Sequence, residues 1–315
     1  MTMTRLEAAR LLMEKDRYVI LTHKGPDGDT TGSAALLCLG LRQLGKTAHV
    51  YYNEEWSPKY LFLVEPLQTE EIGENDTLLC VDVPAEHMLV DFPSEHRQKL
   101  LLRIDHHGSA QSFAPNELVE PQTASCGELV YEILKLMQVE LTEEMALPLY
   151  TAISTDTGCF RYANTTAHTL QTAAACYETG AQLQELNRIY FDTVTRKSQL
   201  VRAFLLENAV ELLDGQVMVC SMTMAQEQEM ELTPEDTHNL AGFARSIEGV
   251  CMAVMLREYE ENRISLSVRA IPGWDAAAFC GRFGGGGHKG AAGGGFEGTM
   301  QEAVAAVRKA VEEGL

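Results

Sequence analysis

The chain has 315 residues, of which 45% are hydrophobic and 22% charged, the balance of a globular protein with one large or two ordinary domains. Its 45 acidic residues outnumber 25 lysines and arginines, which gives a formal net charge of −20. This excludes a broad binding face for long DNA or RNA, because such a face needs many basic contacts to phosphates. A phosphate ligand must be met locally, by metal ions and a few basic side chains, so a small anion is the expected substrate.

No apolar run approaches the length of a membrane-spanning helix, so no membrane partner is expected. Charged residues interrupt the segment Met1 to Asp16, which predicts an amphipathic helix instead of a secretory leader. The eight cysteines are scattered without a C-x-x-C pair and are expected to be free thiols. We therefore expect a cytoplasmic protein, and a homodimer is an open alternative to a monomer.

Short apolar segments alternate with helical patterns in the first half of the chain. Strands are expected at Tyr18 to Thr22, Ala48 to Tyr52, Thr77 to Val81 and Leu100 to Ile104. Helices are expected at Ser33 to Leu44, Ser125 to Leu136, Thr142 to Ile153 and Ala167 to Glu178, the last of them capped by Asn164, Thr165 and Thr166. This alternation is typical of an α/β fold with a mostly parallel sheet.

The second half of the chain predicts a smaller α/β domain. Gln182 to Val210 lacks a strand pattern and predicts a long helical stretch, so residues 184–210 are expected to link a domain of residues 1–183 to one of residues 211–315. Further strands are expected at Gln216 to Met222, Val250 to Leu256 and Arg263 to Ala270. Helices are expected to begin at Thr233-Pro234 and to run from Thr299 to Glu313.

A dense polar cluster, H-K-G-P-D-G-D-T-T-G-S, occupies residues 23–33 after the first strand. His23, Asp27 and Asp29 offer one imidazole and two carboxylates, and the glycines and proline let the backbone turn so that these side chains converge. Divalent cations such as Mn²⁺ accept this mixed set of ligands. A calcium loop of the EF-hand type is excluded, because Cys38 stands where a bidentate glutamate is needed. A plain surface turn is the remaining alternative.

Three more acidic positions follow the predicted elements. Asp82 comes directly after one strand, Asp105-His106-His107 after the next, and Asp156 at the end of a helix. Open α/β sheets bind their ligands at the carboxyl ends of their strands, which favours a shared site. A histidine pair beside a carboxylate suits a metal ligand, an orienting partner and a phosphate contact. The alternatives are a turn or cap residue for Asp82 and a polar loop for the histidines.

A glycine-rich cluster, G-G-G-G-H-K-G-A-A-G, occupies residues 284–293. Gly285, Gly286 and Gly287 would expose backbone N–H groups to a phosphate, and His288 and Lys289 would add positive charge. The cluster is not a dinucleotide fingerprint, since no strand precedes a G-x-G-x-x-G pattern, nor a P-loop, since neither serine nor threonine follows the lysine. A flexible linker is the other interpretation.

Taken together and in order, these clusters resemble the motifs of the DHH phosphoesterase family with a C-terminal DHHA1 domain. The motifs are H-K-G-P-D-G-D-T-T-G-S at 23–33, V-D-V-P around Asp82, D-H-H at 105–107, T-D-T-G-C-F-R-Y at 155–162 and G-G-G-H-K-G-A-A-G at 285–293. The resemblance covers nearly the whole chain. It departs only after Asp82, where Val-Pro replaces the family's smaller or polar residues.

The resemblance implies an active site with two metal ions in the cleft between the two domains. One ion would be bound by His23, Asp27 and Asp82, and the other by Asp29, Asp82, His106 and Asp156. Catalytic roles would fall to Asp82, Asp105 and His107, the last of which would face the scissile phosphate. Arg269, Gly285, Gly286, Gly287, His288 and Lys289 would hold the substrate's far end. Mn²⁺ is the expected cofactor, with Mg²⁺ or Co²⁺ as alternatives.

The two-domain layout most resembles the NrnA type within this family, which implies hydrolysis of short oligoribonucleotides to mononucleotides and of 3′-phosphoadenosine 5′-phosphate (pAp) to AMP. A phosphodiesterase for cyclic di-AMP or pApA carries the same motifs and is the main alternative. An inorganic pyrophosphatase or exopolyphosphatase would leave the glycine-histidine cluster without a purpose. A non-catalytic nucleotide sensor is disfavoured by the intact set of acidic and histidine positions.

Overall fold

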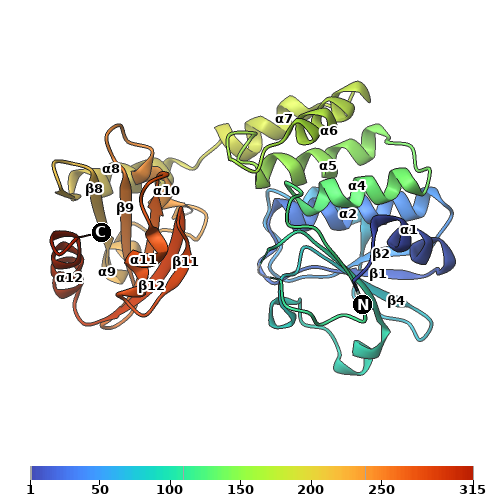
Figure 1. The fold of residues 1–315 in the computed structure, drawn as a ribbon, viewed down its shortest axis with the longest axis horizontal. Coiled ribbons are helices and arrows are strands. Elements are labelled where there is room, and N and C mark those ends of the chain that lie inside the picture. Colours follow the sequence, from blue (N-terminus) through green and yellow to red (C-terminus); the bar gives the residue numbers. More distant parts are fainter. Residues whose placement is uncertain (1, 109, 238, 315) are drawn as a thin grey trace. The chain divides into compact units, whose positions relative to one another are not determined.

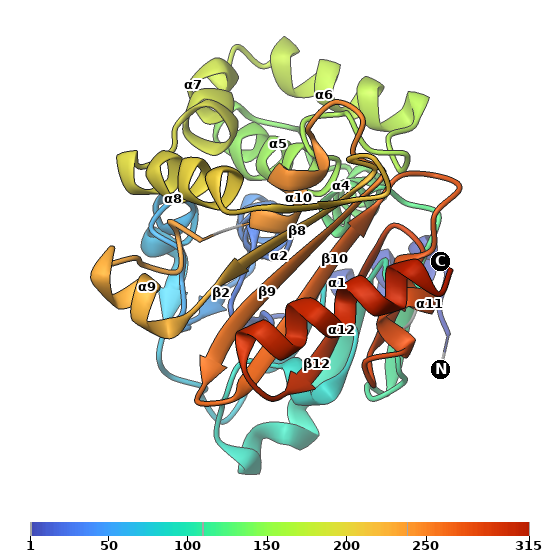
Figure 2. The same ribbon diagram turned by 90° about the vertical axis from the view of Figure 1, so that its left-hand side faces the viewer.

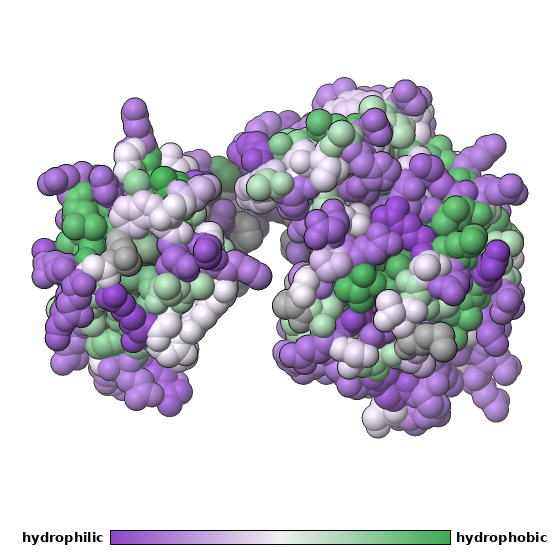
Figure 3. Space-filling model, viewed as in Figure 1, coloured by the Kyte–Doolittle hydropathy of each residue, from purple (hydrophilic) through white to green (hydrophobic). Residues whose placement is uncertain are grey.

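Two compact units make up the chain, Met1–Thr193 and Val194–Leu315 (Figure 1). The computed structural model describes residues 2–108, 110–237 and 239–314. Within these residues no helix is both long and apolar enough to span a membrane. The face of the molecule drawn in Figure 3 is mostly hydrophilic in both units, with apolar side chains in small groups.

A fully parallel sheet of six strands forms the centre of the first unit, in the order β3-β2-β1-β4-β5-β6. The strands are β1 (Tyr18–Leu21), β2 (Ala48–Tyr51), β3 (Gln68–Thr69), β4 (Thr77–Val81), β5 (Leu100–Asp105) and β6 (Asn116–Val119). The predicted parallel α/β fold is confirmed. β3 and β6 were not predicted, because two residues and a polar N-E-L-V segment carry too little apolar signal.

Helices cover one face of this sheet, and irregular segments cover the other. The helices are α1 (Arg5–Glu14), α2 (Gly28–Gln43), α3 (Leu61–Val64), α4 (Cys126–Leu136), α5 (Glu143–Asp156), α6 (Ala167–Glu178) and α7 (Leu183–Asn187). A large apolar core lies between the sheet and α1, α2, α4 and α5. A smaller core on the opposite face includes Leu89, Val90 and Ala114 from the segments that follow β4 and β5.

Helix α2 begins at Gly28, five residues before the predicted start at Ser33. Asp27 is its N-cap, and the Asp27 carboxylate accepts hydrogen bonds from the N–H groups of Asp29 (3.0 Å) and Thr30 (3.1 Å). The prediction of a loop here was wrong because the glycines suggested a turn, whereas the aspartate caps a helix. As a result Asp29 occupies the first helical turn instead of a loop.

The long helix predicted from Gln182 to Val210 is interrupted. A π-helical turn, Arg188–Asp192, follows α7, and the backbone is extended at Thr193 before α8 (Arg196–Glu207) begins. Thr195 caps α8 by accepting a hydrogen bond from the Ser198 N–H at 2.9 Å. β-Branched residues at 193–195 favour the extended backbone, and the two compact units divide within them.

The second unit has a mixed sheet in the order β11-β12-β10-β9-β8-β7, seen face-on in Figure 2. Its strands are β7 (Val210–Leu212), β8 (Val217–Met222), β9 (Met252–Glu260), β10 (Arg263–Ala270), β11 (Gly286–His288) and β12 (Ala291–Glu297). α11 (Ala276–Gly281) and α12 (Met300–Glu312) pack on one face, and α8 with α10 (Leu240–Arg245) on the other. A further helix, α9 (Met224–Glu229), follows β8. Residues 234–237 form a turn, so the helix predicted at Thr233-Pro234 is absent there.

The glycine-rich cluster forms a β-hairpin, β11 and β12, instead of a loop or linker. A Cβ atom at Gly285 would lie 1.9 Å from the Gly293 carbonyl oxygen, so no other residue fits where these backbones approach. The Gly285 N–H donates to the Cys280 carbonyl at 3.0 Å, and this group is therefore already satisfied. Close packing of the backbone therefore explains the glycine at this position, and the sequence did not reveal this packing.

A buried arginine fastens the segment that follows the D-H-H motif to β5. Arg103 is 1% exposed, and its Nη1 donates to the Gln111 carbonyl at 2.6 Å. Its Nη2 lies 3.5 Å from Glu117 Oε1, and its guanidinium stands 4.8 Å from the centre of the Phe113 ring. A single side chain therefore holds several points of the 111–117 segment.

We expect Arg103→Ala to lower the free energy of unfolding by about 3–5 kcal/mol, because Glu117 would lose the partner of a buried ion pair. The control is Arg17→Ala, which removes a half-exposed pair with Asp76 and should change stability by at most about 1 kcal/mol. Urea denaturation of both variants measures the difference. Equal losses in the two variants would contradict this role for Arg103.

Candidate metal centre

The first three candidate residues surround the turn from β1 to α2. His23 follows β1 and pairs with Leu89 in an isolated bridge, which fixes its backbone. Its Nδ1 lies 2.7 Å from the Lys24 carbonyl, so the proton sits on Nδ1 and the Nε2 lone pair is free. That Nε2 faces Asp27 (3.8 Å) and Asp82 (3.9 Å).

Asp82 and Asp105 lie at the carboxyl ends of β4 and β5. β1 has β2 on one side and β4 on the other, so the order of the strands reverses beside these aspartates. Ligands bind at such switch points in open α/β sheets. Asp82 has a left-handed backbone (φ 58°), and its N–H donates to the Ile104 carbonyl at 2.9 Å. Its side chain is thereby directed away from the strand.

Asp29 is held by the N-terminus of α4. One carboxylate oxygen accepts from the Cys126 N–H at 2.7 Å, and the other from the Gly127 N–H at 3.0 Å and the Ser33 hydroxyl at 3.1 Å. The unpaired N–H groups at a helix start, together with the helix dipole, stabilise a carboxylate there. These contacts hold the Asp29 carboxylate in one position, although the residue is only 1% exposed and its charge is shielded from water.

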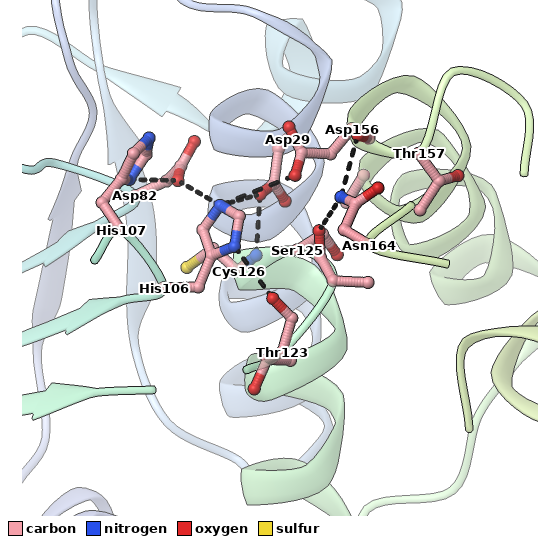
Figure 4. A network of polar contacts seen from close by, with 12 residues as sticks. Asp29, Asp82, His106, His107, Thr123, Ser125, Cys126, Asp156, Thr157 and Asn164 are labelled. Carbon is pink, nitrogen blue, oxygen red and sulfur yellow. Dashed lines mark hydrogen bonds and ion pairs between the residues drawn. The ribbon is translucent and has the colours of Figure 1, made fainter. Parts of the chain in front are cut away.

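The two histidines of the D-H-H motif point in different directions (Figure 4). His106 Nδ1 lies 3.1 Å from the Thr123 carbonyl, which leaves Nε2 facing Asp29 (3.4 Å) and Asp82 (3.5 Å). His107 Nδ1 instead lies 2.8 Å from Asp105 Oδ1, and its side chain is 40% exposed. His106 is therefore suited to bind a metal, and His107 to contact a substrate.

Asp156 is the last residue of α5, and its carboxylate lies 3.7 Å from His106 Nε2. Asn164 fixes this helix end, because its Nδ2 donates to the carbonyls of Asp156 (3.1 Å) and Ala124 (3.0 Å). Asn164 was predicted to cap the next helix, but Thr166 is the N-cap of α6. The asparagine instead ties Asp156 to the segment before α4.

Six of the predicted metal ligands converge in two donor groups. His23, Asp27 and Asp82 form one group, and Asp29, His106 and Asp156 form the other, with the ligand atoms of each within 4.8 Å of one another. Asp82 also groups with His106 and His107, so it lies between the two sets. Asp105 is in neither set, because Oδ1 accepts hydrogen bonds from the backbone N–H groups of His106 (2.8 Å) and His107 (3.2 Å).

Burial and mutual repulsion make the carboxylates of this cluster hard to ionise. Burial, reinforced by Asp156 and Asp27, raises the pKa of Asp29 to about 7, although His106 opposes the rise. Burial and then Asp29 raise the pKa of Asp82 well above its usual value. Burial raises the pKa of Asp156 as well, again opposed by His106. Such a cluster requires positive charge to become fully ionised.

The histidine pKa values shift in the opposite sense to what burial alone would give. The hydrogen bond to Asp105 raises the pKa of His107 despite burial. Burial opposes protonation of His23, but the Asp27 carboxylate and the Lys24 carbonyl outweigh it and raise its pKa. Burial likewise disfavours the Asp105 anion, yet its bonds to His107 hold the pKa of Asp105 below the ordinary value.

The candidate substrate residues of the second unit share one face of its sheet. Arg269 pairs with Ala291 across β10 and β12, and Ala291 pairs with His288 across β12 and β11. Directly opposed residues point to the same side of a sheet, so Arg269 and His288 flank Ala291 on one face. His288 and Lys289 are exposed. The Arg269 guanidinium donates a hydrogen bond to the Val268 carbonyl at 3.1 Å.

Several residues that orient the cluster carry no chemical motif of their own. They are Thr123, Cys126, Gly127 and Asn164, which act through backbone groups or a side-chain amide. Only the helix-start pattern at Ser125, whose hydroxyl accepts from the Glu128 N–H, could have indicated an anion-binding helix N-terminus.

The chain belongs to the DHH family: residues 17–153 match the DHH family N-terminal domain, and residues 214–314 match the DHHA1 domain. It is accordingly a hydrolase of phosphoester bonds. The bifunctional oligoribonuclease and PAP phosphatase NrnA of Thermus thermophilus is 32% identical over 99% of this chain and 94% of that protein. The Bacillus subtilis protein of the same name is 24% identical over 90% of each chain.

Solved structures give the same picture of the fold. An exopolyphosphatase-related protein from Bacteroides fragilis is 25% identical, with a TM-score of 0.82 over 98% of this chain and 96% of that one. A RecJ exonuclease bound to manganese is 15% identical, with a TM-score of 0.54 over 98% of this chain and 93% of that one, and it shows likeness of fold only.

We expect the metal-free protein to lose stability as the pH rises from about 5 to 8. Asp29 and Asp82 have pKa values raised above those of the unfolded chain, so the folded state binds more protons in this range and deprotonation destabilises it. The raised pKa values of His23 and His107 act with the same sign. Thermal unfolding in EDTA should show a fall in Tm on the order of 5–10 °C.

Added Mn²⁺ should raise Tm more at pH 8 than at pH 5, since the ionised carboxylates bind it and protons compete with it. The matched variant is Asp82→Asn. It removes one carboxyl group with a raised pKa, so its Tm in EDTA should depend less on pH. A Tm that rises toward pH 8 without metal would contradict the assigned charge repulsion.

Proposed function

We propose that this chain is a cytoplasmic, Mn²⁺-dependent phosphoesterase that hydrolyses short oligoribonucleotides to mononucleotides and pAp to AMP. The observation that carries the proposal is the pair of donor groups that meet at Asp82. Likeness to NrnA over almost the whole chain supports the choice of substrate. The free state of all eight cysteines supports a reducing compartment.

The residues present fit two divalent cations. Asp82 Oδ1 is buried and has no hydrogen-bond partner among the described residues, which suits an oxygen that would bind a cation. His23 would complete one set with Asp27, and His106 the other with Asp29 and Asp156. When bound, such a pair of cations lowers the pKa of a water molecule toward neutrality and neutralises charge on the phosphoryl group. The mixed imidazole and carboxylate set suits Mn²⁺, with Mg²⁺ or Co²⁺ as alternatives.

His107 would contact the reacting phosphate. Its side chain is 40% exposed, whereas those of Asp82 and Asp105 are at most 3% exposed. The hydrogen bond to Asp105 raises the pKa of His107, and the protonated ring could donate from Nε2 to a phosphoryl oxygen as negative charge develops there. Asp105 acts by orienting this imidazole, in the way that a buried carboxylate orients the histidine of other hydrolases.

The second unit would bind the rest of the substrate. Arg269 and His288 present a guanidinium and an imidazole on one exposed sheet face, and Lys289 adds charge next to them. A guanidinium binds phosphate through two parallel hydrogen bonds. A few basic groups of this kind suit a short anionic substrate in a chain of net charge −20, and no long nucleic acid is proposed as a partner.

A cyclic di-AMP phosphodiesterase is the second candidate. The cyclic-di-AMP phosphodiesterase GdpP of Bacillus subtilis is 24% identical over 96% of this chain but only 48% of that protein. The identity is lower than to the Thermus NrnA, and this chain spans about half of GdpP. We therefore propose oligoribonucleotides and pAp, ahead of cyclic di-AMP, as the substrates.

We expect Asp82→Ala to lower kcat for pAp and for dinucleotides roughly 1,000-fold or more, because both cations would lose a ligand and several kcal/mol of charge stabilisation. The control is Asp76→Ala at the opposite end of β4, where Asp76 accepts a hydrogen bond from Arg17 at 3.0 Å. A Mn²⁺ assay on pAp, pApA, cyclic di-AMP, pyrophosphate and five-nucleotide RNA measures both. Full turnover by Asp82→Ala would remove the two-ion scheme, and wild-type preference for pyrophosphate would refute the nucleotide substrates.

We expect His288→Ala and Arg269→Ala to raise KM for dinucleotides about 10- to 100-fold with little change in kcat, since each removes a contact to a charged group away from the reacting atoms. Arg263→Ala, at the other end of β10, should leave KM unchanged, because Arg263 pairs with Glu260 at 3.4 Å on the surface. A fall in kcat at constant KM would show that these residues act on the chemical step instead.

A further inference from the structure

The turn after Asp156 has an unusual backbone. Gly158 (φ 56°), Cys159 (φ 57°) and Phe160 (φ 63°) are three consecutive left-handed residues, and two of them have side chains. The left-handed conformation costs roughly 1–2 kcal/mol for each such residue. Strained backbone of this kind persists only where its surroundings hold it, and it concentrates at functional sites.

A network of contacts holds the turn in place. The Thr157 carbonyl accepts hydrogen bonds from the N–H groups of Arg161 and Tyr162, each at 3.0 Å. Arg161 Nε donates to the Gly158 carbonyl at 2.6 Å. The Phe160 ring packs against Tyr150, with ring centres 6.0 Å apart. The turn therefore directs Phe160 inward, while the following Arg161 and Tyr162 are exposed.

Tyr162 lies against the backbone of Gly158. A Cβ atom built on Gly158 would stand 2.3 Å from Tyr162 Cζ and 2.6 Å from both Cε1 and Cε2. These nearly equal distances place the glycine Cα over the face of the ring, so no side chain larger than hydrogen fits there. Tyr162 is nevertheless 52% exposed. The ring is therefore seated on the glycine while about half of the residue is open to solvent.

The ring covers Gly158, which follows the candidate metal ligand Asp156 by two residues. The Tyr162 carbonyl accepts from the Thr165 N–H at 3.1 Å, and the neighbouring Asn164 donates to the Asp156 carbonyl at 3.1 Å. Asn164 lies within the turn that Tyr162 and Thr165 close, and it ties this turn to the helix end that carries Asp156. An exposed aromatic face beside a phosphate-directed centre offers a surface for a nucleobase.

We propose that Tyr162 is the platform on which the nucleobase next to the reacting phosphate stacks, with Gly158 as its seat and Arg161 as the residue that locks the turn. This inference rests on the nucleotide substrates proposed above. Stacking suits this position, because an aromatic face binds any base without using charge. The phosphate and the base are then recognised by separate groups.

The test compares the binding of AMP with that of ribose 5-phosphate, which has the same sugar and phosphate without a base. Calorimetric titrations in Mn²⁺ measure both ligands on the full chain. The wild type should prefer AMP, and Tyr162→Ala should weaken AMP binding roughly 5- to 150-fold while ribose 5-phosphate binds as before. Tyr162→Phe keeps the ring face and should retain the preference for AMP.

Tyr177→Ala is the control, since this exposed tyrosine of α6 contacts the Tyr150 ring instead of Gly158. Gly158→Ala is a second variant that displaces the ring from its seat, and it should lose the preference for AMP in the same way. Undiminished AMP binding by Tyr162→Ala, or equal loss of both ligands, would overturn the platform. AMP binding is measured without turnover. A failure to hydrolyse pAp would therefore refute the proposed function and leave the test of Tyr162 unaffected.

Discussion

Repulsion among buried carboxylates is the constraint on which the metal centre depends. Asp29, Asp82 and Asp156 come from three segments far apart in the sequence, yet they interact. Burial raises the pKa of all three, Asp156 adds to the rise at Asp29, and Asp29 adds to the rise at Asp82. The ion pairs that the structure shows for these carboxylates are with histidines, and none among the described residues is with arginine or lysine. An arrangement that disfavours its own ionisation becomes favourable when divalent cations bind, so folding stability is given up for metal affinity.

Backbone groups keep this repulsive cluster in one geometry. The start of α4 grips Asp29, the Thr123 carbonyl fixes the ring of His106, and the Asp105 carboxylate fixes that of His107. Because each of these side chains has a second partner outside the cluster, it cannot rotate away to relieve the charge. The histidines in particular are held as specific tautomers, which separates the role of a ligand from that of a substrate contact.

The sequence predicted most of the first unit because its strands are short apolar runs and its polar clusters follow directly after them. Thr77–Val81 with Asp82, and Leu100–Asp105 with the two histidines, show both signals side by side. It failed where local pattern and tertiary contact disagree. The glycines at 284–287 suggested a phosphate-binding segment or a linker, yet Gly286 and Gly287 pair with β12 and Gly285 packs closely against Gly293, and local pattern does not reveal either contact. The partners supplied by Thr123 and Gly127 were invisible for the same reason, since a carbonyl or N–H is present at nearly every residue.

The two units have separate hydrophobic cores, and this has a thermodynamic consequence. The cores of the first unit draw on residues up to Leu186, and those of the second begin at Val201. Every acidic and histidine donor of the metal centre belongs to the first unit. A cation that binds only the native form of one unit stabilises that unit alone. Heat absorption during unfolding should then resolve into two cooperative events whose separation depends on manganese concentration, and the Tm that responds to pH and metal is that of the first unit.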